Sequence, residues 1–276
     1  MPASRLFALG LASAGALAAC NQYVDIGART DAGDATPGAA DTVSLDASIP
    51  DAPVPDAPTS SILWSSSFES GDSSEWNQGG AAVGGTFSRL VTMSVGEERA
   101  HTGTRAMKIG FDTTDGQDHM AELYRRVEPG PAYYSAWFFI SEMHAPDRYW
   151  TVLYFFYQKE AGMSATRHGL WDVNLDRQSV YFYDEPGSHQ TNAQPRKLYP
   201  IGQWFHLEAY FAYEPPRNGH VTVWLDGDQI LDVPNLGVAA SDNLYWGIGS
   251  DSNGMDPPRC TMYVDDAKIS TTRVGP

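Results

Sequence analysis

The sequence predicts an all-β domain, a two-sheet antiparallel β-sandwich, on the strength of three observations. Apolar and polar residues alternate with a period of two, turn residues interrupt this pattern about every ten residues, and no sustained helical period appears. All eight Trp lie beyond residue 61 of the 276-residue chain, so residues 61–276 are the expected domain. Its expected strands are 105–111, 121–127, 133–141, 150–158, 169–175, 179–185, 204–213, 220–227, 229–233, 245–250 and 261–269.

The chain begins with a segment typical of export. After Arg5 the apolar run LFALGLASAGALAAC is too short to cross a bilayer, as in a secretory signal peptide. The run ends in LAAC at residues 17–20, which resembles the bacterial lipobox. That resemblance implies removal of residues 1–19 and a lipid on Cys20 that anchors the exported protein to the cell envelope, with Asn21 favouring the outer membrane. Ordinary secretion with Cys20 unmodified is the alternative.

Residues 20–60 are expected to form a disordered tether. From residue 21 onward this segment has seven Asp, five Pro and one Arg, and it lacks the apolar periodicity needed to bury a core. Proline and charge repulsion should keep it extended. The chain has only two cysteines, so a lipid on Cys20 would leave Cys260 without a partner in the chain, and the domain must be stable without a disulfide.

The clearest local pattern is the hairpin WFHLEAYFAYEPPRNGHVTVWLDGDQI, residues 204–230. Alternation places residues 205, 207, 209, 211 and 213 on a core face, and Asp226-Gly227 supplies a tight turn. This hairpin, with IGQW before it and YVDDAKI near the C-terminus, resembles the concanavalin A-like lectin and glucanase superfamily, which includes jelly-roll polysaccharide lyases and carbohydrate-binding modules. The resemblance implies a jelly roll over most of residues 61–270.

The same resemblance implies a structural calcium ion between the two ends of the domain. Modules with a similar start and end hold calcium there, and the matching acids are Glu69 in FESG and Asp265 in VDD, with loop carbonyls near Gly71 completing the oxygen ligands. The alternative is that Glu69 is a solvated turn acid and Asp265 caps a strand.

The composition favours carbohydrate as the partner. The net charge of −16 argues against nucleic acid, whereas abundant aromatic residues suit the apolar faces of sugar rings. The candidate binding residues are Tyr149 and Trp150 at a loop-to-strand junction and Asp172 and Asn174 on a strand. The leading interpretation is therefore a monomeric surface domain that binds a polysaccharide without chemistry. A non-catalytic envelope scaffold is another possibility, and no nucleotide, zinc or serine-hydrolase motif is present.

A polysaccharide lyase acting by β-elimination on a uronate is the enzymatic alternative. The segment AELYRR resembles the Arg-x-Glu-Leu-Arg motif of alginate-lyase-like jelly rolls, with Met120 where the motif begins with Arg. Alternation places Glu122, Tyr124 and Arg126 on one face of this strand.

Two further residues complete the set that the lyase interpretation needs. Gln158 resembles the Gln of a Gln-apolar-His element, although Lys159 and Glu160 follow it, so His168 is the candidate substitute for the missing His. A retaining glucanase is not supported, because its alternating acids are absent from the sequence.

Overall fold

The computed structural model describes residues 62–77, 84–142, 150–158, 167–176, 178–214, 218–238, 243–252 and 254–276. The expected signal peptide (1–19), the tether (20–60) and Cys20 lie outside the described residues, so these predictions stay open. Within the described residues, no helix has both the length and the apolar character that crossing a membrane requires.

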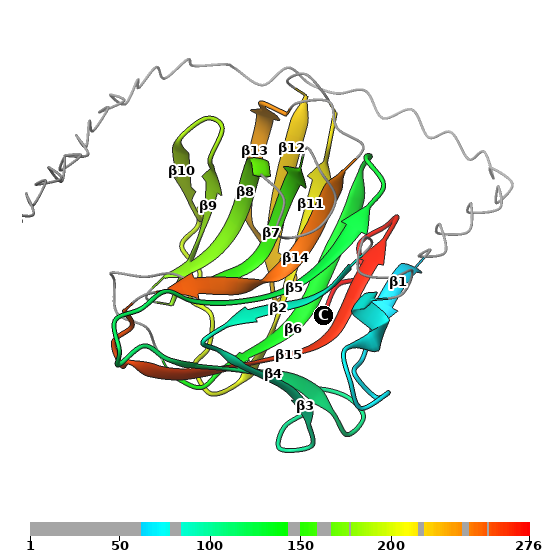
Figure 1. The fold of residues 1–276 in the computed structure, drawn as a ribbon. Helices are drawn as coiled ribbons and strands as arrows, with labels where there is room; N and C mark the ends of the chain where they lie inside the picture. Colours follow the sequence, from blue (N-terminus) through cyan, green and yellow to red (C-terminus); the bar gives the residue numbers. More distant parts are fainter. Residues whose placement is uncertain are drawn as a thin grey trace, which may run out of the picture. The chain divides into compact units, whose positions relative to one another are not determined.

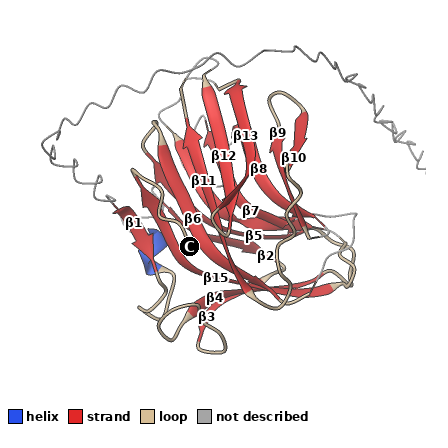
Figure 2. Cartoon of the chain, turned by 180° about the vertical axis from the view of Figure 1, so that it is seen from behind, coloured by secondary structure: helices blue, strands red, loops and turns tan. Residues whose placement is uncertain are grey.

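The described strands form two antiparallel sheets (Figures 1 and 2). The eight-stranded sheet has the order β13-β12-β11-β6-β15-β4-β3, with β1 paired to β15, and the seven-stranded sheet has the order β10-β9-β8-β7-β14-β5-β2. The bounds of the first sheet are β1 Ile62–Ser66, β3 Thr92–Gly96, β4 Ala106–Asp112, β6 Ala132–Ile140, β11 Trp204–Ala212, β12 Gly219–Leu225, β13 Asp228–Leu236 and β15 Arg259–Ser270. Those of the second are β2 Gly84–Arg89, β5 His119–Val127, β7 Trp150–Gln158, β8 Arg167–Asp176, β9 Ser179–Asp184, β10 His189–Asn192 and β14 Leu244–Ser252. A short 3-10 turn, η1, spans Ser74–Asn77.

The predicted all-β sandwich is confirmed, and each of the eleven expected strands is present. Four strands that the sequence pattern did not predict are β1, β2, β3 and β10. Of these, β2, β3 and β10 are the end strands of their sheets, and β1 lies off the main path. An end strand has a neighbour on one side only, so its exposed residues show little apolar alternation.

Aromatic side chains from both sheets fill the space between them. Phe155 of β7 stacks on Phe211 of β11 with ring centroids 4.4 Å apart. Tyr134 of β6 contacts both Phe155 and Trp246 of β14, at 4.9 and 5.4 Å. These contacts cross from one sheet to the other and define the core. They also explain how the domain holds together although the buried Cys260 forms no disulfide with any described residue.

The hairpin β11-β12 has the predicted core face, since the side chains of residues 205, 207, 209 and 211 are fully buried. The turn between β12 and β13 is also as predicted: Asp226 and Gly227 both have positive φ, at 48° and 85°. The first and last strands lie side by side, because β1 pairs with β15, seen as the cyan and red strands in Figure 1.

The C-terminal segment crosses the outer face of the eight-stranded sheet. Glu208 of β11 is fully buried there, and it accepts hydrogen bonds from the Arg273 side chain at 3.1 Å and from the backbone N–H of Val274 at 2.7 Å. His206, two residues earlier, is also buried, and its ring lies against Trp137. Burial, with Lys268, Arg273 and His101 nearby, lowers the pKa of His206 to about 4.

We predict that His206 makes the domain less stable in acid. Its pKa is below the ordinary value of 6.5, so between pH 6.5 and 4 the unfolded chain takes up a proton that the folded domain does not. The free energy of unfolding should therefore fall by up to about 3 kcal/mol relative to the His206→Gln variant as the pH drops from 7 to 4. Urea denaturation of both proteins across this range measures the difference, and a difference that stays constant with pH would contradict the prediction.

Candidate functional site

Strand β5 turns three candidate residues towards the outer face of the seven-stranded sheet. Ala121, Leu123 and Val127 belong to the core, so the alternate residues Glu122, Tyr124 and Arg126 point the other way. Glu122 and Tyr124 are 6% and 8% exposed, whereas Arg126 is exposed. Membership of Ala121, Leu123 and Val127 in the core thus gives the three residues the shared face that the sequence predicts. Their chemical roles stay predictions.

The neighbouring strand β14 places two glycines beside the candidate residues of β5. Gly247 pairs with Tyr124 and Gly249 pairs with Glu122, so two successive outward positions of β14 carry no side chain. At the next outward position Tyr245 is fully buried, and its ring lies 6.2 Å from that of Tyr124. A Cβ at Gly249 would collide with the carbonyl oxygen of Ala121, so glycine lets β14 lie close against β5 there.

Strand β8 contributes Asp172 and Asn174 to the same outer face. Their neighbours Trp171, Val173 and Leu175 belong to the core, so alternation directs Asp172 and Asn174 outward. The two residues are only 4% and 1% exposed. They pair with Tyr183 and Tyr181 of β9, which are half-buried. These two tyrosines were not among the binding residues predicted from the sequence.

Register relates the β5 and β8 residues across the sheet. Tyr124 pairs with Gly247, Gly247 with Tyr154, and Tyr154 with Asp172, so they occupy one row across four strands. Adjacent strands lie about 4.8 Å apart, which places the two ends of this row about 14 Å apart. Leu170 of β8 packs against the cluster that Tyr124 and Tyr245 form.

The remaining predicted glycan residues are placed only in part. Trp150 begins β7, Gln158 ends it, and His168 is the second residue of β8. For these three residues the structure describes the backbone and not the side chain. Tyr149 lies outside the described residues. The interpretations that involve these four side chains remain predictions.

The environment of Tyr124 keeps its phenol protonated. Burial, then the nearby Tyr245 and Glu122, raises the pKa of Tyr124 above its ordinary value of 10. A protonated phenol donates a hydrogen bond and can supply a proton to a leaving oxygen. Tyr124 therefore remains a hydrogen-bond donor at neutral pH.

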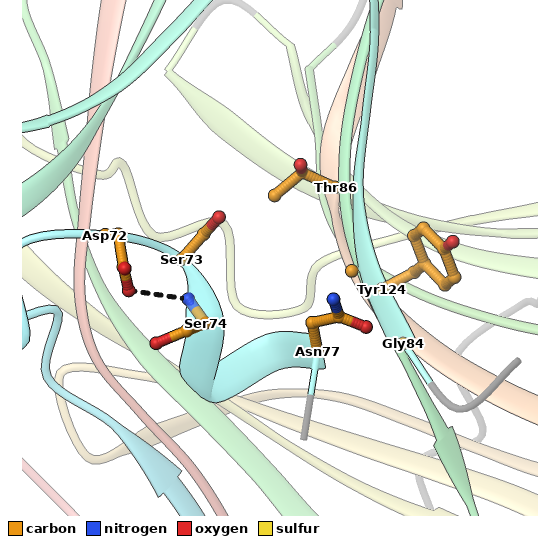
Figure 3. A pocket seen from close by; sticks show the side chains of 8 residues that line it. Asp72, Ser73, Ser74, Asn77, Gly84, Thr86 and Tyr124 are labelled. Carbon is orange, nitrogen blue, oxygen red and sulfur yellow. Dashed lines mark hydrogen bonds between the residues drawn. The ribbon is translucent and has the colours of Figure 1, made fainter. Parts of the chain in front are cut away.

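A pocket of about 370 Å³ adjoins Tyr124 at the β2 edge of the sheet (Figure 3). Its lining comes from the η1 segment, from β2 and from β5: Asp72, Ser73, Ser74, Asn77, Gly84, Gly85, Thr86 and Tyr124. The sequence analysis missed this pocket because β2 was not predicted and because the η1 segment is distant in sequence from β5.

The two acids expected to bind calcium converge on one loop, residues 101–105. Glu69 accepts hydrogen bonds from the backbone N–H groups of Thr104 and Arg105, at 2.8 and 2.7 Å, and these bonds lower its pKa. Asp265 is fully buried and accepts bonds from the N–H groups of His101 and Thr102, at 2.8 and 3.2 Å. Burial raises the pKa of Asp265 to about 6.

This arrangement ties both ends of the domain to the 101–105 loop through hydrogen bonds. No cluster of three or more His, Cys, Asp or Glu suited to a metal occurs in the described part of the chain. Two converging carboxylates are suitable calcium ligands, but here their oxygens face N–H donors, so a bound ion would have to replace those bonds. Calcium binding stays a prediction.

We predict that calcium raises the melting temperature of the protein relative to the chelated sample. Calcium at about one hundred times its Kd would stabilise the fold by about 3 kcal/mol, which corresponds to a rise of about 5–10 °C. Glu69→Gln should abolish the rise, and Glu98→Gln, which alters an exposed glutamate, should keep it. Equal melting temperatures with calcium and with chelator would contradict the prediction.

Comparison with solved structures gives the class of fold. A scan of protein-family models finds no match, and a search of curated proteins finds none either. The cellulose-induced protein Cip1 matches with a TM-score of 0.56 and 17% identity, over 77% of this chain and 99% of Cip1. A marine alginate lyase from Aplysia kurodai matches with a TM-score of 0.53 and 13% identity, over 76% and 99% of the two chains.

A third solved structure, the endo-β-1,4-glucuronan lyase from the fungus Trichoderma reesei, has a TM-score of 0.51 and 14% identity, and the match covers 67% of this chain and 90% of the lyase. The domain is thus a concanavalin-like jelly roll of the kind also found in polysaccharide lyases. At these identities the likeness establishes the fold alone.

Proposed function

We propose that the outer face of the seven-stranded sheet binds a polysaccharide. The observation that carries this proposal is the burial of Glu122, Asp172 and Asn174 on a face that points away from the core. Burying polar groups costs free energy unless they are hydrogen bonded, so stability alone favours apolar or exposed residues at such positions. Each of the three interacts with neighbouring residues, so the polar groups are held in place before a ligand arrives.

The surrounding residues suit sugar units in particular. Half-buried Tyr181 and Tyr183 offer aromatic surface with a hydroxyl, a combination that can both contact a ring face and hydrogen bond its substituents. The row from Tyr124 to Asp172, about 14 Å long, is long enough to contact several linked units rather than one. Exposed Arg126 on the same face supplies a positive charge for a uronate carboxylate.

A second candidate function, a lyase, is favoured by the position of Tyr124 and Arg126 on the same outer face of β5. In β-elimination a base removes the proton at C5 of the uronate, a C4–C5 double bond forms, and the C4–O bond breaks as the leaving oxygen receives a proton. Tyr124 would give that proton, Arg126 and Gln158 would neutralise the carboxylate, and His168 would be the base. Alginate and glucuronan lyases among the structural neighbours support this candidate.

The N-terminal sequence, which lies outside the described residues, also suggests where the protein is located. We infer that the leader is removed, that Cys20 carries a lipid, and that residues 20–60 hold the domain away from an envelope membrane. The glycan-binding face would then be displayed outside that membrane on a flexible spacer.

We predict that Tyr183→Ala weakens binding to the recognised polysaccharide at least about tenfold, which is about 1.4 kcal/mol. The variant removes half-buried aromatic surface from the proposed face. The matched control is Tyr210→Ala, because Tyr210 is a half-buried tyrosine on the outer face of the other sheet. Affinity electrophoresis against a panel of neutral and uronate-containing polysaccharides measures both.

The same panel distinguishes binding from catalysis. Ultraviolet absorbance from an unsaturated product, lost in Tyr124→Phe while retention on the glycan persists, would establish the lyase. Retention without such absorbance would leave binding as the function. Equal retention of Tyr183→Ala and wild type, or a loss confined to Tyr210→Ala, would overturn the proposed face.

A further inference from the structure

The pocket between η1 and β2 offers a different chemistry from the rest of the proposed face. We propose that it is a subsite for an uncharged sugar unit, so that the recognised glycan joins uronate and neutral residues. This inference rests on the proposed function, because the pocket shares Tyr124 with the glycan-binding face. The Tyr124 phenol would contact both the sugar unit in the pocket and the neighbouring unit on the glycan-binding face.

Two successive glycines shape the pocket. A Cβ at Gly84 would collide with the carbonyl oxygen of Trp76 and lie 2.7 Å from that of Tyr124, so glycine allows the η1 segment to pack closely against β2 and β5. A Cβ at Gly85 would lie 3.6 Å from the phenol oxygen of Tyr124. A side chain at this position would occupy the approach to Tyr124, and glycine leaves that approach open.

The polar groups in the pocket match those of a sugar. Ser73, Ser74 and Thr86 provide hydroxyls and Asn77 provides an amide, and each of these groups can both donate and accept hydrogen bonds. Figure 3 shows Ser73, Asn77 and Thr86 around the space between η1 and β2. A volume of about 370 Å³ lies within the range of small-molecule sites.

The negative charge of Asp72 favours an uncharged sugar unit in the pocket. The hydroxyl and the backbone N–H of Ser74 bind Asp72 and lower its pKa, so Asp72 is ionised at neutral pH. None of the eight lining residues, all of which are described, is Lys, Arg or His. A uronate carboxylate would therefore meet a negative charge without a compensating cation, whereas the hydroxyls of a neutral sugar could donate to Asp72.

The opposite preference holds at Arg126, two residues further along β5 on the same face as Tyr124. Its exposed guanidinium favours a carboxylate. A glycan that satisfies both positions carries an anionic unit near Arg126 and an uncharged unit at the β2 edge. A polymer of uronate alone satisfies only the first.

We predict that the full-length protein binds a tetrasaccharide of alternating glucuronate and glucose at least about tenfold more tightly than a tetrasaccharide of uronate alone, a difference of about 1.4 kcal/mol. Isothermal titration calorimetry measures both. Asn77→Ala should weaken binding of the alternating tetrasaccharide about tenfold and leave the all-uronate ligand within about twofold. Asp72→Asn should reduce the difference in affinity between the two tetrasaccharides, because it strengthens binding of the all-uronate one. Asn218→Ala, an exposed asparagine in the turn before β12, is the matched control and should change neither affinity.

Equal affinities of the wild type for the two ligands, or an equal loss of both in Asn77→Ala, would overturn the subsite. If polysaccharide retention depends on Tyr183 but not on Asn77 or Asp72, the proposed face stands and the subsite fails. If the wild type binds neither tetrasaccharide nor any polysaccharide, both the function and the subsite fail.

Discussion

Packing between the two sheets determines which side chains can meet a ligand. Phe155 stacks on Phe211 across the interface, and Tyr134 joins β6 to β7 and β14, so each strand of the seven-stranded sheet must turn one set of alternate residues inward. The other set is then fixed to the outer face. A register slip of one residue would place Glu122 in the core and Leu123 outside, which the aromatic core prevents.

The same packing offsets the free-energy cost of burying polar side chains on the outer face of the seven-stranded sheet. The core is continuous across both sheets and includes Trp64, Trp76, Trp171 and Trp246, so it supplies apolar burial in a domain without a disulfide among its described residues. The ends are held separately, by β1 pairing with β15 and by Glu69 and Asp265 binding the 101–105 loop. Neither device uses residues of the outer face of the seven-stranded sheet.

Sequence reasoning predicted the central strands and the direction of Glu122, Tyr124 and Arg126, because both follow from local alternation. It missed the end strands β2, β3 and β10, where exposure removes the alternation, and therefore missed the pocket beside β2. The pattern YWGIGS contained a signal that could have been used, since its glycines fall at the outward positions opposite Tyr124 and Glu122. The meeting of Glu69 and Asp265 on the 101–105 loop depends on contacts far apart in the chain, which no local pattern specifies.

The central claim, that the outer face of the seven-stranded sheet binds glycan, is tested most directly by hydroxyl-radical footprinting of tyrosines with and without saturating polysaccharide. Tyr181 and Tyr183 lie on that face, and Tyr133 and Tyr210 are half-buried on the outer face of the other sheet. The account predicts that glycan protects Tyr181 and Tyr183 from oxidation and leaves Tyr133 and Tyr210 unchanged. Protection of Tyr133 and Tyr210 alone, or of none of the four, would contradict it.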